Sequence, residues 1–168
     1  MNPPRRILGI DPGLIITGYG VLDVSGVRPV VVEAGIIRTA DDGADDMASK
    51  VLSVYNGVAE LLAQFKPETM AVEQLYAHYD HPQTAILMGH ARGVIFLAAA
   101  QHTLDVVSYA ATQVKKIVTG NGRASKEQVQ RTIQNELGLS TPPEPVDVSD
   151  ALAVALCHYY HLKNFGQG

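Results

Sequence analysis

Three apolar stretches, separated by turns too short to hold a helix, occupy the first 40 residues of the chain. They predict strands over 7–10, 17–24 and 29–39, with "DPG" and "SG" as the turn-forming sequences. Parallel strands need a crossover of about a dozen or more residues, so connections this short favour antiparallel pairing. The chain is therefore expected to begin as an antiparallel meander of three strands.

The rest of the chain alternates helical and strand patterns. The spacing of apolar residues predicts helices over 45–66, 82–103, 112–118, 125–137 and 148–162, and strands over 70–73 and 104–110. The order βββ-α-β-α-β-α-α-α predicts an α/β fold. Its five-stranded mixed sheet would contain three antiparallel and two parallel strands, with helices on both faces.

Length and composition indicate one domain over residues 1–168, because 46% of the residues are hydrophobic and 18% are charged. The net charge of -4 argues against a protein that coats nucleic acid nonspecifically. The single cysteine, Cys157, is interpreted as a small core residue and fits a reducing compartment, the cytoplasm. No signal peptide is evident, and the apolar stretch 85–100 is expected to be too short for a bilayer. We therefore expect a soluble protein without membrane contact.

Four acidic residues could meet at one edge of the predicted sheet. Asp11 and Glu73 end two apolar strands, where ligands of open α/β sheets bind. Asp147 and Asp150 are three residues apart and share one helical face. Clustered carboxylates raise one another's pKa unless a cation neutralises them. Oxygen ligands favour Mg²⁺ or Mn²⁺, and two such ions can support phosphodiester hydrolysis.

Each of these acids also has a purely structural interpretation. Asp147 could be a helix N-cap with Asp150 as its capping-box partner, and Asp11 could form an Asx turn. Glu73 could be an exposed residue on an edge strand. The sequence leaves these alternatives open.

A basic segment follows the last predicted strand. Five of the 13 basic residues lie within 17 positions: Lys115, Lys116, Arg123, Lys126 and Arg131. They could contact phosphates, although a basic helical face is often only solvated. Tyr76 could stack on unpaired bases or anchor a loop. His78 and His81 could supply a base near the crevice, whereas His158 and His161 are expected at the surface.

Six segments in this order closely resemble the RuvC family of Holliday-junction resolvases over residues 7–161. They are "LGIDPG" with "TGYGVL", "AVEQLY", "HARGV", "YAATQVKKIVTGNGRASKEQV" and "VDVSDALAVAL". The resemblance implies a ribonuclease-H-like fold, which agrees with the predicted order of strands and helices. It also implies a structure-selective endonuclease for four-way DNA junctions in recombination and repair. The products would carry 5′-phosphate and 3′-hydroxyl ends.

The resemblance also implies roles for individual residues. Asp11, Glu73, Asp147 and Asp150 match the four metal-binding catalytic residues of the family. Lys115 and Lys126 match basic residues near the scissile phosphate, and Tyr76 matches an aromatic that acts at the crossover.

Assembly and partners follow from the same resemblance. Paired cuts in a two-fold junction call for a homodimer, with the helix over 82–103 as the candidate interface. The RuvA and RuvB branch-migration complex is the expected partner.

The chain departs from the family pattern at three places. Leu14-Ile15-Ile16 stands where many relatives have a polar or basic residue, Tyr76 where phenylalanine is frequent, and Asp147 where some have histidine. Three other functions remain to be separated: a related nuclease of ribosomal RNA processing, an ATP-binding domain of the actin and sugar-kinase type, and a noncatalytic junction-binding protein. The ATP-binding alternative calls for hydroxyl residues after the first turn and for a second domain.

Overall fold

The computed structural model describes residues 5–75 and 80–165, which form a meander of strands followed by alternating helices and strands. The strands are β1 (Arg6–Asp11), β2 (Ile16–Asp23), β3 (Val30–Arg38), β4 (Thr69–Glu73) and β5 (Asp105–Tyr109). The helices are α1 (Met47–Phe65), α2 (Pro82–Gln101), α3 (Ala111–Thr119), α4 (Lys126–Glu136) and α5 (Val146–Phe165), and a short 3-10 turn, η1 (Thr39–Asp42), precedes α1. Apart from this turn, the predicted order is confirmed.

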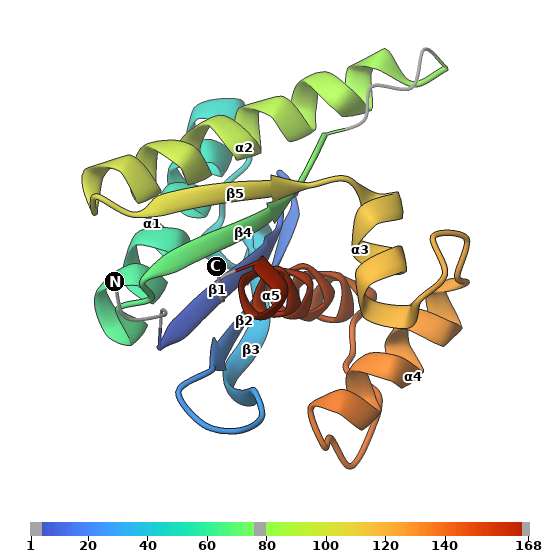
Figure 1. Ribbon diagram of the computed structural model, residues 1–168. Helices are drawn as coiled ribbons and strands as arrows, with labels where there is room; N and C mark the ends of the chain where they lie inside the picture. The colour runs from blue at the N-terminus through green and yellow to red at the C-terminus, as the bar shows by residue number, and fades with distance from the viewer. Residues whose placement is uncertain (1–4, 76–79, 166–168) are drawn as a thin grey trace.

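All five strands belong to one mixed sheet in the order β3-β2-β1-β4-β5 (Figure 1). Strands β1, β2 and β3 pair antiparallel, whereas β4 and β5 extend the sheet in parallel from β1. The predicted combination of three antiparallel and two parallel strands is confirmed. Because β1 and β4 are parallel neighbours, their carboxyl ends lie at the same edge of the sheet.

Helices cover both faces of the sheet (Figure 1). Strand side chains alternate between faces, so Leu8 and Met70 join the core under α1 and α2. Ile7 and Ala71 join the second core, which α5 covers together with α3 and α4. The sheet thus separates two apolar layers, and the face under α5 is the one that leads to the predicted carboxylates.

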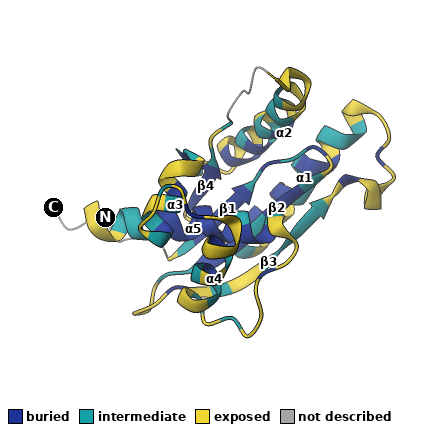
Figure 2. Cartoon of the chain, turned by 90° about the vertical axis from the view of Figure 1, so that its right-hand side faces the viewer, coloured by how far each residue is buried: buried dark blue, intermediate teal, exposed yellow. Residues whose placement is uncertain are grey.

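Helix α5 is buried over most of its length (Figure 2). Every residue from Val148 to His158 is buried except Asp150. Cys157 is a free, fully buried thiol, as predicted from its apolar surroundings. The one partly exposed position in this run is therefore a carboxylate, which a structural helix would not need there.

His158 corrects one of the predictions, because it lies in the core rather than at the surface. Its Nε2 is 3.2 Å from the Thr69 hydroxyl, and its Nδ1 is 2.6 Å from the Tyr109 hydroxyl. Thr69 is also 3.5 Å from the carbonyl oxygen of Asp105, so the tautomer with its proton on Nε2 would satisfy all three groups, with Tyr109 donating to Nδ1. Burial lowers the pKa of His158 to about 4, so the ring is neutral. Partners distant in sequence make this burial possible.

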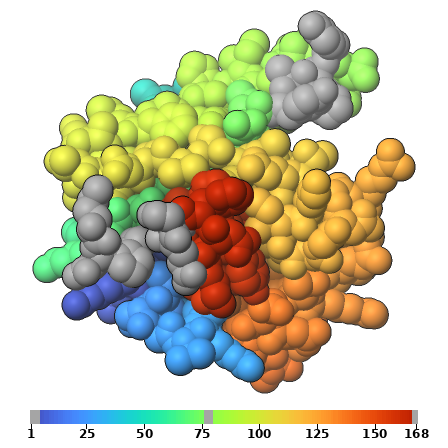
Figure 3. Space-filling view, viewed as in Figure 1, coloured from blue at the N-terminus to red at the C-terminus, as the bar shows by residue number. Residues whose placement is uncertain are grey.

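Helix α2 runs along one side of the molecule with much of its surface uncovered (Figure 3). Its buried residues are small or lie late in the helix, whereas Ile86, Leu87 and Leu97 are exposed. Within residues 5–75 and 80–165, α2 is the one helix long and apolar enough to cross a membrane. The prediction that this stretch is too short is wrong, because the helix spans 20 residues. Its buried face nevertheless packs on the core of the domain.

Candidate active site

Asp11 and Glu73 end neighbouring parallel strands of the sheet. The register pairs Ile10 with Val72, which places the next two residues, Asp11 and Glu73, beside each other. Ala71 faces α5, and strand side chains alternate, so Glu73 and Asp11 also project toward α5. Glu73 is half-buried in an internal strand. The alternative of an exposed residue on an edge strand is therefore wrong.

The first turns of α5 bring Asp147 and Asp150 to the same edge. Gly18 is the cross-strand partner of Asp11, and a Cβ at Gly18 would overlap the backbone carbonyl oxygen of Asp147. A Cβ at Gly9 would likewise overlap a carbonyl oxygen of α5. These two glycines let the backbone of α5 rest directly on the sheet. The start of α5 is thereby held over the end of β1.

The helix boundary bears on the capping interpretation of Asp147. Helix α5 begins at Val146, and the amide of Val148 donates to the Pro145 carbonyl oxygen over 3.0 Å. Asp147 thus lies inside the first turn rather than before it. Its negative charge still interacts favourably with the helix dipole at this end.

We predict that Gly18→Ala lowers the free energy of unfolding by about 1–3 kcal/mol, the usual range for overpacking a closely packed site. The new methyl group would collide with the Asp147 backbone, which cannot rotate away as a flexible side chain could. Urea unfolding measures the effect. Gly26→Ala is the matched control, because the nearest atom to a Cβ there is 3.8 Å away. Equal losses in the two variants would contradict the close seating of α5.

The carboxylates of this edge perturb one another. Burial, followed by the charges of Asp150, Glu73 and Asp147 in that order, raises the pKa of Asp11 to about 8, while the charge of Lys126 acts in the opposite direction. Burial is also the main cause of the raised pKa of Glu73 and of Asp150. Asp11 thus shares one partly buried region with three other acidic groups, where burial and neighbouring negative charge oppose its ionisation.

A cavity of about 200 Å³ opens beside these carboxylates, between the end of β4 and helices α3, α4 and α5. Its polar lining consists of Glu73, Asp150, Lys115 and Lys126, and the remaining lining is apolar. The charges of both lysines lower the pKa of Glu73 and Asp150 against the effect of burial. Two of the predicted phosphate-binding residues thus lie at the carboxylate cluster. Lys126 is the first residue of α4, next to the N-cap Ser125.

The other predicted contact residues are placed differently. Lys116 and Arg123 are exposed and do not line this cavity. Tyr76 and His78 lie outside the described residues. His81 is the exposed N-cap residue of α2, and its side chain makes no capping hydrogen bond there.

Arg92 is a neighbour of the site that the sequence did not single out. Its Nη1 donates a hydrogen bond to the backbone carbonyl oxygen of Glu73, and its guanidinium carbon lies 5.0 Å from the centroid of the Phe96 ring. The segment "HARGV" contains Arg92, but nothing in the local sequence indicates that this helical arginine contacts Glu73, which lies 19 residues earlier in the chain.

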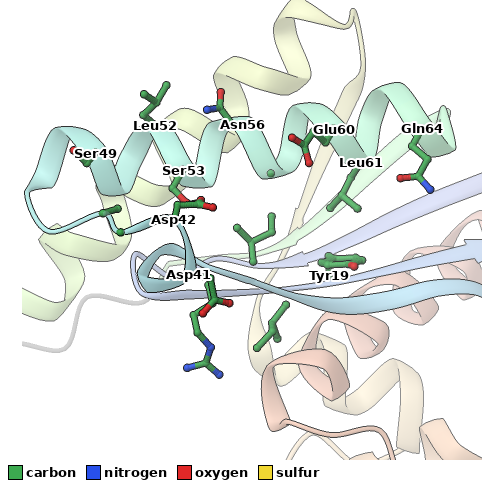
Figure 4. A pocket seen from close by; sticks show the side chains of 16 residues that line it. Tyr19, Asp41, Asp42, Ser49, Leu52, Ser53, Asn56, Glu60, Leu61 and Gln64 are labelled. Atoms are coloured by element: carbon green, nitrogen blue, oxygen red, sulfur yellow. The ribbon is translucent and has the colours of Figure 1, made fainter.

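A larger cavity of about 650 Å³ lies away from this edge, between α1, η1 and β3 (Figure 4). Three acidic residues, Asp41, Asp42 and Glu60, line it against one basic residue, Arg38, and Ser53 donates a hydrogen bond to Asp42. None of the four clustered carboxylates lines it. The basic residues at the α3–α4 edge therefore distinguish the first cavity as the candidate site for a phosphate-bearing ligand.

The donor chemistry of the carboxylate cluster fits a hard divalent cation. Oxygen ligands with raised pKa values gain most from a neighbouring positive charge, because it stabilises their ionised forms. Within the part of the chain that the structure describes, no three such side chains already stand close enough together to hold a metal ion. The edge is thus a crowded carboxylate cluster rather than a preassembled chelate.

Comparisons with known proteins agree with this arrangement. A family model for crossover junction endodeoxyribonuclease RuvC matches residues 7–158. The RuvC protein of Rhodopirellula baltica is 48% identical over 158 residues, which cover 94% of this chain and 88% of the relative. The structure of Thermus thermophilus RuvC in complex with a Holliday junction substrate superposes with a TM-score of 0.87 at 31% identity. That match covers 95% of this chain and 96% of the other.

The sheet order and these structural matches define a domain with the ribonuclease-H-like fold. The site at its edge is that expected of a nuclease. The chain belongs to the RuvC family of crossover junction endodeoxyribonucleases.

Proposed function

We infer that this protein is a structure-selective endonuclease that resolves four-way DNA junctions during recombination and repair. The observation that carries the inference is the gathering of four acidic residues and two lysines at one sheet edge in a RuvC-family chain. The reaction is hydrolysis of phosphodiester bonds in two strands of like polarity. It leaves 5′-phosphate and 3′-hydroxyl ends.

Nucleases of the RuvC family depend on divalent metal. We propose that Asp11, Glu73, Asp147 and Asp150 form the catalytic ligand set for two Mg²⁺ or Mn²⁺ ions. When bound, such ions activate a water molecule and stabilise the leaving oxygen. The protein's own contribution is to hold the four carboxylates at one edge, two from strand ends and two from α5, which lies directly on the sheet. Because the four proposed ligands come from three separate elements, the distances between them depend on how these elements pack together.

The positive residues beside this cluster would hold the DNA backbone. Lys115 and Lys126 line the cavity next to Glu73 and Asp150, which supports their proposed contact with the phosphate that reacts. We propose Lys116 and Arg123 as further contacts on the exposed surface of the same helical region. Tyr76, which follows β4, is proposed to stack on bases at the crossover.

We expect the double variant Lys115→Gln, Lys126→Gln to bind the junction more weakly at low salt. The slope of log affinity against log salt should fall by about two units, because each lost phosphate contact removes roughly 0.9 of a released counterion. Fluorescence anisotropy at several salt concentrations, with Ca²⁺ in place of the active metal, measures this slope. The control is Lys66→Gln, Lys163→Gln, which changes the charge equally outside the cavity. An unchanged slope in the first variant would contradict the phosphate role.

The proposed assembly is a homodimer, because two related cuts require two sites with matching symmetry. Helix α2 offers an interface, since Ile86, Leu87 and Leu97 are exposed on a mostly apolar helix. The chain would act as a single nuclease domain over 1–168, in the cytoplasm, together with the RuvA and RuvB branch-migration complex.

One experiment separates the competing functions. The protein is incubated with Mg²⁺ or Mn²⁺ and, in parallel, with a mobile four-way junction, a plain duplex and a structured RNA. The proposal expects paired nicks in the junction and little cleavage of the other two substrates. Preferred cleavage of the RNA would favour a ribosomal RNA nuclease. Binding of junctions of varied sequence without any cleavage would favour a noncatalytic junction-binding protein.

A further inference from the structure

Arg92 contacts the catalytic edge from the side opposite to the carboxylate cluster. The side chain of Glu73 projects toward α5, whereas Arg92 belongs to α2 on the other face of the sheet. Arg92 reaches the backbone carbonyl oxygen of Glu73, and it does not line the cavity that contains Lys115 and Lys126. Its position suits support of the strand end rather than contact with the substrate.

The hydrogen bond falls where β4 loses its regular partners. The register of β4 with β1 ends at Val72, and on the β5 side the amide of Gln74 donates to the Tyr109 carbonyl oxygen. The carbonyl group of Glu73 accepts from Arg92 at this point. A charge-assisted hydrogen bond is roughly twice as strong as a neutral one, so this donor holds the strand end firmly.

Arg92 also marks the point at which α2 meets the domain. From Pro82 to His90 the helix has no buried residue, whereas Ala91 and Ile95 are buried. The stacking of the Arg92 guanidinium over Phe96, one turn further along, restricts the directions in which it can donate. Arg92 thus lies where the exposed first half of α2 gives way to its packed second half, and it joins this point of the helix to the end of β4.

We propose that Arg92 is a positioning residue that fixes the Glu73 carboxylate for metal binding and links it to α2. The proposal rests on the metal-dependent function inferred above. A misplacement of about 1 Å can cost about 100-fold in rate, so a loose strand end would impair cleavage without loss of DNA contacts.

The test compares Arg92→Gln and Arg92→Lys in the full-length protein. For Arg92→Gln we expect single-turnover junction cleavage to fall about 10–100-fold, the range found when the outer partners of a metal ligand are removed. The Mn²⁺ concentration for half-saturation, followed by electron paramagnetic resonance without DNA, should rise about 10-fold by the same reasoning. The dissociation constant for the junction in Ca²⁺ should stay within about 2-fold, because lost phosphate contacts would change it far more. Arg92→Lys, which keeps a cationic donor, should recover most of the cleavage rate and Mn²⁺ affinity.

Arg28→Gln is the matched control, since it removes one exposed positive charge far from Glu73 in the sequence. Three results would overturn the proposal. The first is Arg92→Gln with the same cleavage rate and Mn²⁺ affinity as the control. The second is a loss of junction binding that accounts for the whole loss of cleavage, which would make Arg92 a DNA contact. The third is a cleavage rate and Mn²⁺ affinity of Arg92→Lys as low as those of Arg92→Gln, which would leave Arg92 with only a structural role. If the unmodified protein never cuts a junction, the proposed function fails, while the Mn²⁺ titration still decides the role of Arg92.

Discussion

Asp150→Asn is expected to reduce junction cleavage by more than about 100-fold, because a metal ligand should matter more than the outer partners whose loss costs 10–100-fold. Asp150 is partly exposed within the otherwise buried part of α5, and it lines the cavity that also contains Glu73 and both lysines. Asparagine preserves the shape of the side chain but removes its charge. Junction binding should therefore be retained, and the loss of a negative charge near phosphates can only favour it.

A labelled junction serves both measurements, with cleavage followed in Mg²⁺ or Mn²⁺ and binding followed in Ca²⁺. Asp105→Asn is the control, since Asp105 is an exposed carboxylate at the opposite end of its strand from the site edge. Loss of an outer partner of a metal ligand typically costs about 10–100-fold. If Asp150→Asn cleaved the junction at more than a tenth of the unmodified rate, its loss would be smaller still, and Asp150 would not be a metal ligand. A proportional loss of binding would assign Asp150 to the DNA interface instead.

The second large effect concerns stability without metal. Asp11 has a pKa of about 8 in the folded protein, well above the ordinary value of 3.8. Between these two pH values the folded protein holds a proton that the unfolded chain has released. The stability linked to this proton is complete below pH 3.8 and is lost as the pH rises to about 8. The metal-free protein should thus become less stable over this interval, and raised pKa values at Glu73 and Asp150 act in the same direction.

Asp11→Asn should remove much of this pH dependence and abolish cleavage. Near pH 8 we expect the variant to be more stable than the unmodified protein by about 2 kcal/mol or more, since one pKa unit corresponds to about 1.4 kcal/mol and solvent screens part of the shift. Urea unfolding in EDTA at pH 5, 6, 7 and 8 measures the two curves. Mn²⁺ should restore stability to the unmodified protein but much less to the variant. If the free energy of unfolding changed equally with pH in the two proteins, the raised pKa of Asp11 would not be the cause of the pH dependence.

The sequence predicted the sheet well because its local signals agree with the final fold. Short turns dictate antiparallel pairing of the first three strands, and apolar runs that end in Asp11 and Glu73 place both acids at carboxyl ends. Helix α1 joins β3 to β4 as a crossover, which makes β4 parallel to β3 and therefore also to β1. Lys115 and Lys126 could be proposed as a pair because they lie in one basic segment.

The contacts that refine the site could not be predicted, because each joins residues distant in sequence. Nothing in the local sequence shows that Gly18 lies under Asp147, or that Arg92 donates to the end of β4. His158 was expected at the surface because its partners, Thr69 and Tyr109, come from two other strands. Such contacts depend on how whole elements dock, which local patterns do not encode.

The seating of α5 on glycines has a consequence for the mobility of the site. Where Gly9 and Gly18 meet the helix, main chain touches main chain, and no side-chain rotamer lies between them to absorb a displacement. A shift of the helix would have to move the backbone of two elements at once, so thermal motion between Asp147 and the end of β1 should be small. The entropy of placing the backbone that carries these carboxylates is then lost when the chain folds rather than each time a substrate binds. Metal binding would have to bring together only the side chains, because the main chain beneath them is already in place.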